Sequence, residues 1–218
     1  MSEFSLWDIV SNLLLAARWT VLLSLLAFAG GSVVGVALLM GRLASHRWLR
    51  WVIDAWIKLL QGSPLLILLF MGFFGLPLLG IDVTAWVAAS VILIAYTGAF
   101  LADIWLGSIE AIARGQWAAG ASLGLSRRQQ FIHIIVPQAA RIATPPTVGF
   151  LVQVVKNTSL TSIIGFVELS KTGSMLNNVT FEPFPIYMSV ALIYFAICFP
   201  MTYSARILER HLGKGSHA

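Results

Sequence analysis

The sequence has few charged residues, and long stretches of it contain none. Only 11% of its 218 residues are Asp, Glu, Lys or Arg, whereas 58% are hydrophobic and the mean hydropathy is +0.86. Soluble domains carry roughly a quarter charged residues. The composition therefore excludes an ordinary soluble domain and favours a membrane protein. The chain is long enough for about five spans of roughly 20 residues.

Several functional signals are also missing. The single cysteine, Cys198, rules out an internal disulfide framework, and the four histidines lack the spacing of a metal site. No G-x-x-x-x-G-K-[ST] pattern occurs, so the chain has no phosphate-binding loop of its own for ATP. The first ten residues include Glu3 and Asp8 but no basic residue, and we therefore predict no cleaved signal peptide.

Five apolar segments are each long enough to span a membrane as a helix. The sequence therefore predicts an all-α membrane protein with one transmembrane domain over residues 1–218. Gly31 and Gly35 lie four residues apart in the first segment, a spacing that suits close helix packing. The expected spans cover about 20–40, 52–74, 84–106, 138–155 and 186–205.

Basic residues set the expected orientation. If five helices alternate, ten of the 14 Lys and Arg residues fall on one side, in segments 41–51 and 107–141 and in the tail after residue 205. Lys and Arg concentrate in cytoplasmic loops, so the N-terminus is expected outside the cell and the C-terminus in the cytoplasm. The net charge of +5 is then a topology signal, and nucleic acid is not an expected partner because aromatic and basic residues do not alternate.

Breaks in two of the expected spans indicate where a solute would pass, because freed backbone groups can bind polar ligands. The breaks are expected at "QGSP" (61–64) and "TPPT" (144–147), and the outer loop 156–185 is expected to hold a short re-entrant or gate helix over 158–169. Polar side chains near these points form the candidate substrate pathway: Gln61, Ser63, Lys156, Thr158, Ser159 and Glu168.

The basic loop 107–137 is predicted to contain two short helices joined by an elbow. Residues 109–122 are rich in helix formers, and Ser126 with Gln129 three positions later forms a capping-box pattern. The second helix is expected to end at Pro137.

This loop also carries a resemblance to a known family. The motif is EAA, then Gly, then Ile-x-Leu-Pro, and the corresponding residues here are Ala118-Ala119-Gly120, Gly124 and 134–137. In this pattern the chain resembles the inner-membrane permease subunits of bacterial ATP-binding-cassette (ABC) importers. The stretches "GQW", "LGLS", "PQAAR", "GSPLL", "KNTSL" and "VEL", in family order over about residues 12–210, are similar to the polar amino-acid uptake family.

The resemblance implies a type I ABC importer permease fold in the bacterial inner membrane. The chain would form half of a translocation pathway for an amino acid, without catalysis and without a cofactor, because a partner ATPase binds ATP. The implied partners are two ATPase subunits, a second permease subunit, a periplasmic amino-acid-binding protein and membrane lipid. The residues implied in ATPase coupling are Trp117, Ala118, Ala119, Gly120, Gly124, Leu125, Ser126 and Arg127.

The sequence departs from the family pattern at three of the matched positions. Ala118 stands where the family has Glu, Gly120 where it has the second Ala, and Gln61 where it usually has Arg. Two alternatives remain open at this stage. The same machinery would also import another small zwitterion, such as an opine or cystine. An intramembrane enzyme is the other alternative, and Asp54 and Asp103 are its only candidate acid pair.

Overall fold

The computed structural model describes residues 5–44 and 46–213, and within these ranges it contains helices and connecting segments but no strand. Short turns of other helix types connect or extend the α-helices at residues 71–75, 77–79, 131–135 and 158–164. The α-helices are α1 (Leu6–Leu43), α2 (Arg47–Gly62), α3 (Leu65–Phe70), α4 (Ala85–Glu110), α5 (Arg114–Ser122), α6 (Arg127–Gln130), α7 (Val136–Asn157), α8 (Leu169–Thr180) and α9 (Pro183–Gly213).

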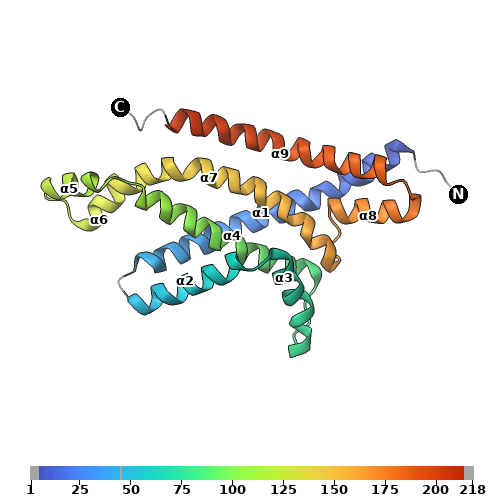
Figure 1. Ribbon diagram of the computed structural model, residues 1–218, viewed down its shortest axis with the longest axis horizontal. Coiled ribbons are helices and arrows are strands. Elements are labelled where there is room, and N and C mark those ends of the chain that lie inside the picture. The colour runs from blue at the N-terminus through green and yellow to red at the C-terminus, as the bar shows by residue number, and fades with distance from the viewer. Residues whose placement is uncertain (1–4, 45, 214–218) are drawn as a thin grey trace.

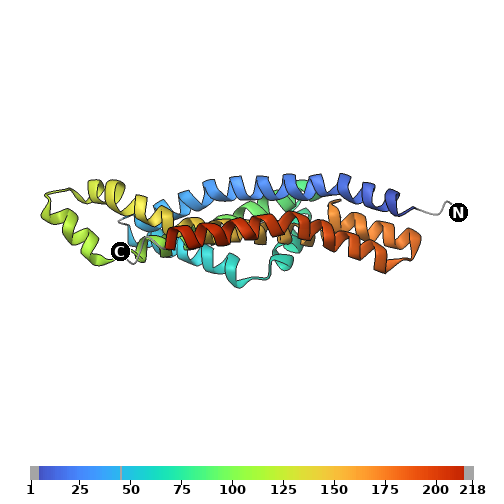
Figure 2. The same ribbon diagram turned by 90° about the horizontal axis from the view of Figure 1, so that it is seen from above.

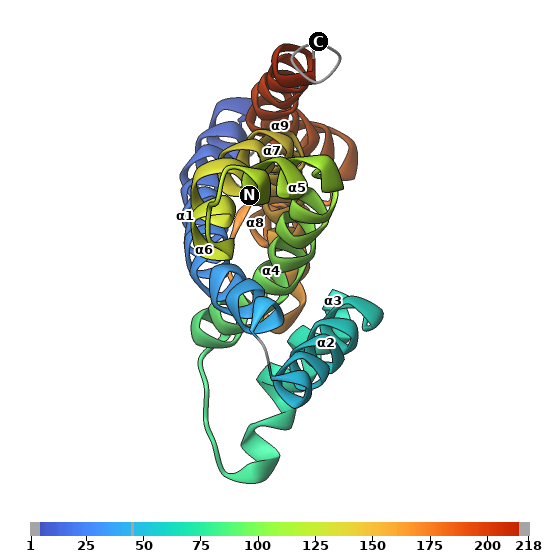
Figure 3. The same cartoon turned by 90° about the vertical axis from the view of Figure 1, so that its left-hand side faces the viewer.

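The molecule is elongated, and different helices form its two ends (Figures 1 and 2). The helices α5 and α6 project beyond the ends of α1 and α2, at the same end of the molecule as the C-terminus (Figures 1 and 2). The N-terminus lies at the opposite end. Seen along the long axis, α2 and α3 lie to one side of the group formed by α1, α4 and α7 (Figure 3).

Three of the described helices are long and apolar enough to cross a membrane. They are Leu6–Leu43, Ala85–Glu110 and the part of α9 that covers Pro183–Arg210. Two bent pairs, Arg47–Gly62 with Leu65–Leu79 and Arg127–Ile164 with Leu169–Thr180, bring the number to five if each pair makes one span. The chain is therefore an all-helical membrane protein with three to five candidate spans.

Helix α1 begins well before the expected segment 20–40. Ser5 caps it, because its hydroxyl accepts from the Asp8 amide at 3.2 Å and its own amide donates to Asp8 Oδ2 at 3.1 Å. The resulting helix of 38 residues follows the bundle for most of its length (Figure 1).

Helices α1 and α4 pack closely along a seam of glycines. A Cβ on Gly31 would lie 2.5 Å from Thr97 Cγ2, and one on Gly98 would lie 2.6 Å from Val34 Cγ1. Real Cβ atoms do not approach other atoms so closely, so any larger residue at these positions would force the facing side chain or the helices to move. The close packing predicted from the spacing of Gly31 and Gly35 is confirmed.

The predicted break at "QGSP" is also confirmed. Ser63 is extended (φ −102°, ψ 136°), as the residue before a proline tends to be, and α2 and α3 meet at a bend of 102°. Helical hydrogen bonding restarts at Pro64, whose carbonyl accepts from the Ile67 amide at 2.9 Å.

The predicted break at "TPPT" is wrong, because α7 runs without interruption through Pro145 and Pro146. Proline removes a donor but its fixed φ suits a helix. Thr144 stays helical here, and the Thr147 hydroxyl accepts from Trp105 Nε1 at 3.0 Å, which holds this part of α7 against α4. Pro64, which follows Gly62 and Ser63, therefore lies at a helix break. Pro145 and Pro146, by contrast, lie within a helix that is held against α4.

The segment after α7 begins with a 3₁₀ turn over Thr158–Ile164 and a left-handed Gly165. The segment expected to be one short helix over 158–169 is therefore divided. Helix α8 follows from Leu169, and its core residues pack with α1 and α9, as in the cluster of Ile9, Leu13, Leu169 and Ile186.

Candidate functional site

The α5–α6 elbow, defined here as residues 114–130, is a compact two-helix unit. Gly124 has φ +73°, a left-handed conformation that reverses the chain after α5. Ser126 then caps α6, with its hydroxyl accepting from the Gln129 amide at 3.4 Å and its amide donating to Gln129 Oε1 at 2.9 Å. The predicted capping box is confirmed.

Two features of the predicted elbow are wrong. The region expected to be one helix over 109–122 is interrupted at residues 111–113, where α4 ends and α5 begins. The second helix does not end at Pro137 but continues into α7 through a π-helical stretch, Phe131–Ile135. The Val136 amide donates to the Phe131 carbonyl, five residues back. This wider turn directly precedes a proline, which cannot donate a helical hydrogen bond.

The inner side of the elbow is tightly packed. Gly120 is buried, and a Cβ there would lie 2.8 Å from Gln130 Cγ. Gln130 is itself buried and donates to the Leu125 carbonyl at 2.7 Å. Trp117 and Phe131 stack with ring centroids 6.5 Å apart, next to a small core of Ile112, Ile135 and Ala139. The two helices therefore hold one another in a fixed relative orientation.

The outer side of the elbow is open. Ala118, Ala119, Gly124, Ser126 and Arg127 are exposed, and Leu125 is half-buried. Leu123 lies at the tip and is 77% exposed. Of the eight residues predicted for coupling, Gly120 is buried, Trp117 and Leu125 are half-buried, and the other five are exposed. The open side of the elbow therefore presents an apolar side chain at its tip, with Arg127 exposed nearby in the sequence.

A second polar site lies where α1, α2 and α4 meet. Arg42 Nε lies 2.7 Å from Asp54 Oδ1, and a second nitrogen of the same guanidinium contacts Asp103. Gln61 Nε2 donates to Asp103 Oδ2 at 2.7 Å. Gln61, predicted to line the substrate pathway, thus joins this ion-pair network. The two acids considered as a catalytic pair both bind Arg42, which sequence analysis had counted only as a topology signal.

Glu168 is fully buried in a third polar site, between α1, α8 and α9. It accepts from Thr20 Oγ1 at 3.1 Å, from the Tyr194 hydroxyl at 2.9 Å and from the Lys171 amide at 2.9 Å. Thr20 Oγ1 also accepts from the Leu169 amide at 3.2 Å. Glu168 therefore caps α8 and connects three helices, and in this chain its carboxylate faces protein and not an open passage.

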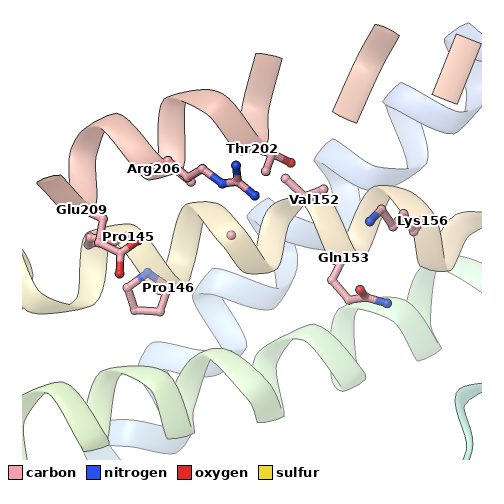
Figure 4. A pocket seen from close by; sticks show the side chains of 10 residues that line it. Pro145, Pro146, Val152, Gln153, Lys156, Thr202, Arg206 and Glu209 are labelled. Atoms are coloured by element: carbon pink, nitrogen blue, oxygen red, sulfur yellow. The ribbon is translucent and has the colours of Figure 1, made fainter. Parts of the chain in front are cut away.

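Lys156 lines a cleft of about 410 Å³ between α7 and α9. The cleft is also lined by Gln153, Arg206 and Glu209. Figure 4 shows Arg206 reaching from α9 toward α7, with Lys156 further along α7. Arg206 and Glu209 lie in what was predicted to be the cytoplasmic tail. Nothing in the sequence pattern connected them with Lys156, because the pairing depends on the packing of two distant helices.

The remaining predicted pathway residues make mainly local contacts. Thr158 Oγ1 donates to the Val155 carbonyl at 2.8 Å, and Ser159 Oγ donates to the Lys156 carbonyl at 2.7 Å. Ser63 is half-buried at the α2–α3 break. The six predicted residues are thus divided among several places and do not converge on one pocket. Within residues 5–44 and 46–213, no three His, Cys, Asp or Glu side chains gather as a metal site would require.

Comparison with known proteins agrees with this architecture. Residues 31–214 match the family described as "Binding-protein-dependent transport system inner membrane component", and the chain belongs to this family of transport permease components. It is 33% identical to a probable glutamine ABC transporter permease protein of Bacillus subtilis (strain 168), over 89% of this chain and 90% of that protein.

Two further matches extend the comparison. An L-cystine transport system permease protein of Bacillus subtilis (strain 168) is 29% identical over 96% of this chain and 89% of its own length. The crystal structure of an amino acid ABC transporter with histidines superposes with a TM-score of 0.91 and 25% identity, over 97% of this chain and 99% of that one. The fold is therefore that of an ABC importer membrane subunit.

Proposed function

We propose that this chain forms half of the translocation pathway of an ATP-driven amino-acid importer. The observation that carries the proposal is the superposition with an amino acid ABC transporter over nearly the whole of both chains. Its partners would be two ATPase subunits, a second permease subunit and a periplasmic amino-acid-binding protein, in the bacterial inner membrane. ATP would be bound by the ATPase, and this chain would carry no cofactor.

The proposed topology has five spans, with the N-terminus outside and the C-terminus in the cytoplasm. Three long helices and two bent pairs supply the spans. The elbow and the C-terminus lie at the same end of the molecule (Figure 1), and this end includes most of the basic residues. In this orientation the elbow projects into the cytoplasm, where an ATPase subunit can contact it.

The elbow would transmit closure of the ATPase to the transmembrane helices. Its outer face is exposed, whereas its inner face is packed against the helix that continues through the π-helical stretch into α7. A push on Leu123 would therefore act on α7, which forms one wall of the cleft that includes Lys156. Of the predicted pathway residues, Lys156 is the one we retain as a contact for a passing solute.

The test is to separate ATP hydrolysis from transport. The experiment uses vesicles that contain the full assembly. Gly124→Val forces a branched side chain into φ +73°, which strains the backbone of the elbow. The new side chain meets no neighbour, because no other atom lies within 4 Å of the added Cβ, so the distortion stays local. We expect solute uptake to fall while hydrolysis loses its response to the binding protein. Gly107→Val, at another glycine with open space around it, is the control. Normal uptake and normally stimulated hydrolysis by Gly124→Val would refute the coupling role.

One observation favours a different cargo for the same machinery. The L-cystine permease is similar over 96% of this chain at 29% identity, whereas the glutamine permease is similar over 89% at 33% identity. Both solutes are zwitterions that carry α-amino and α-carboxylate groups. Uptake of labelled glutamine and cystine in competition, by the same vesicles, distinguishes them.

A further inference from the structure

The elbow contains three arginines and no acidic residue. Between Glu110 and Glu168 the sequence contains no acidic residue. Arg114, Arg127 and Arg128 lie within the elbow and are exposed. Among the residues that the structure describes, both ion pairs involve Arg42, so these three arginines have no carboxylate partner within that part of the chain.

The positions of the arginines do not serve the stability of the elbow itself. Arg127 and Arg128 are the first two residues of α6, where the helix dipole opposes positive charge. The helix ends are fixed by the capping box and by the Gln130 bond to Leu125, neither of which involves an arginine. These cations are therefore available to a partner.

Ala118 explains why Arg114 is free. The two residues are four apart on α5 and face the same side of that helix, so an acid at 118 would lie next to Arg114. The chain has alanine at this position, exposed and without charge. The substitution thus removes the one acid that the family motif would place on the elbow.

We infer that the elbow binds an acidic surface: an apolar pocket for Leu123, flanked by Asp and Glu side chains, on the ATPase subunit. This inference rests on the proposed function, which supplies the partner, and adds the chemistry of its docking face. Anionic lipid headgroups would also attract arginines. A protein partner is favoured because α5 and α6 project beyond the ends of α1 and α2 along the long axis (Figures 1 and 2) and present an exposed leucine at the tip.

The test measures binding of the ATPase subunit that purifies with the full-length permease. The permease is held in nanodiscs of neutral phosphatidylcholine, and the dissociation constant is measured between 50 and 500 mM KCl, on the order of the range in which surface charges become screened. We expect the constant to rise steadily with salt. At low salt, Ala118→Glu should weaken binding by up to about fivefold, and Arg114→Ala by a similar factor.

Two matched variants keep the result specific. Ala118→Gln adds a side chain of the same size as glutamate but without charge, and Arg210→Ala removes an exposed cation from α9, outside both the elbow and the cleft lined by Lys156. Both should bind as the unchanged protein does. Salt-independent binding with Ala118→Glu equal to Ala118→Gln would overturn the acidic partner while leaving the proposed function intact. Binding that requires anionic lipid in the disc would also overturn it. Absence of ATPase binding at any salt would contradict the proposed function itself.

Discussion

The α1–α4 seam and the α5–α6 elbow both contain glycines that no other residue replaces easily, but for opposite reasons. At Gly31 a neighbouring side chain would stand 2.5 Å from an added Cβ, whereas at Gly124 no atom lies within 4 Å and the requirement is a φ of +73°. At the seam the facing helix fills the space next to each glycine. The elbow is shaped by its own backbone and is open on one side. The first arrangement provides stability, and the second leaves a surface free for a partner.

The largest effect on stability is expected at the seam. Gly31→Ala places a methyl group against Thr97 and the Gly98 backbone and should lower the free energy of unfolding by about 1–3 kcal/mol. Thermal unfolding of the detergent-solubilised protein measures this. Gly107→Ala, in α4 but with open space around it, is the control and should leave the midpoint unchanged or slightly raised. Equal midpoints for the two variants would show that the seam is not tightly packed.

A smaller loss is expected at the corner where α1, α2 and α4 meet. Arg42→Ala leaves Asp54 and Asp103 without their cation and should cost about 1–2 kcal/mol, because both carboxylates are partly solvated. Gln61 already donates to Asp103, so an arginine there would reach the same carboxylate. We therefore expect Gln61→Arg to restore much of the midpoint lost in Arg42→Ala. Failure of this rescue would mean that the geometry of Arg42, and not its charge alone, holds the corner.

The hydrogen bonds at Glu168 should contribute less to the free energy of unfolding. Tyr194→Phe removes a hydroxyl that lies 2.9 Å from Glu168 Oε2 and 3.0 Å from Ser170 Oγ. The loss of both contacts should cost about 1 kcal/mol in net stability, because Glu168 keeps its bonds from Thr20 and the Lys171 amide. Tyr203→Phe removes an exposed hydroxyl from the same helix and should change nothing. If both variants unfold at the midpoint of the unchanged protein, then the Tyr194 hydroxyl does not contribute to stability through Glu168.

The elbow should show the smallest effect on stability. Leu123→Ala truncates a side chain that is 77% exposed and should leave the unfolding midpoint within error. Solute uptake by the full assembly should nevertheless fall, since the tip loses its apolar contact. A drop in midpoint similar to that of Gly31→Ala would mean that Leu123 belongs to the core of the permease and not to an open surface.

Local sequence signals predicted local structure well. The spacing of Gly31 and Gly35, the Ser126 capping box and the break at Ser63–Pro64 each depend on residues close together in the chain, and the structure has all three. The errors arose at Pro137 and at Pro145–Pro146, where packing and a π-helical turn carry a helix through proline. The helix propensity of single residues does not include these tertiary contacts.

The polar sites were harder to predict because their members are far apart in sequence. Arg42 and Asp103 are separated by 61 residues, and Thr20 and Glu168 by 148. Only the packing of α1 against α4 and α8 determines which of these side chains meet. The candidate pathway was dispersed for the same reason, since Gln61 and Glu168 found partners on helices that the sequence did not connect.

The most direct measurement of the central claim is photo-crosslinking from the tip of the elbow. A benzoylphenylalanine at position 123 in the full assembly should yield an adduct of permease and ATPase subunit. The same group at Phe184, which is 76% exposed at the start of α9 and at the other end of the molecule, should yield none. An ATPase adduct from position 184, or none from position 123 while the assembly remains intact and active, would contradict the account.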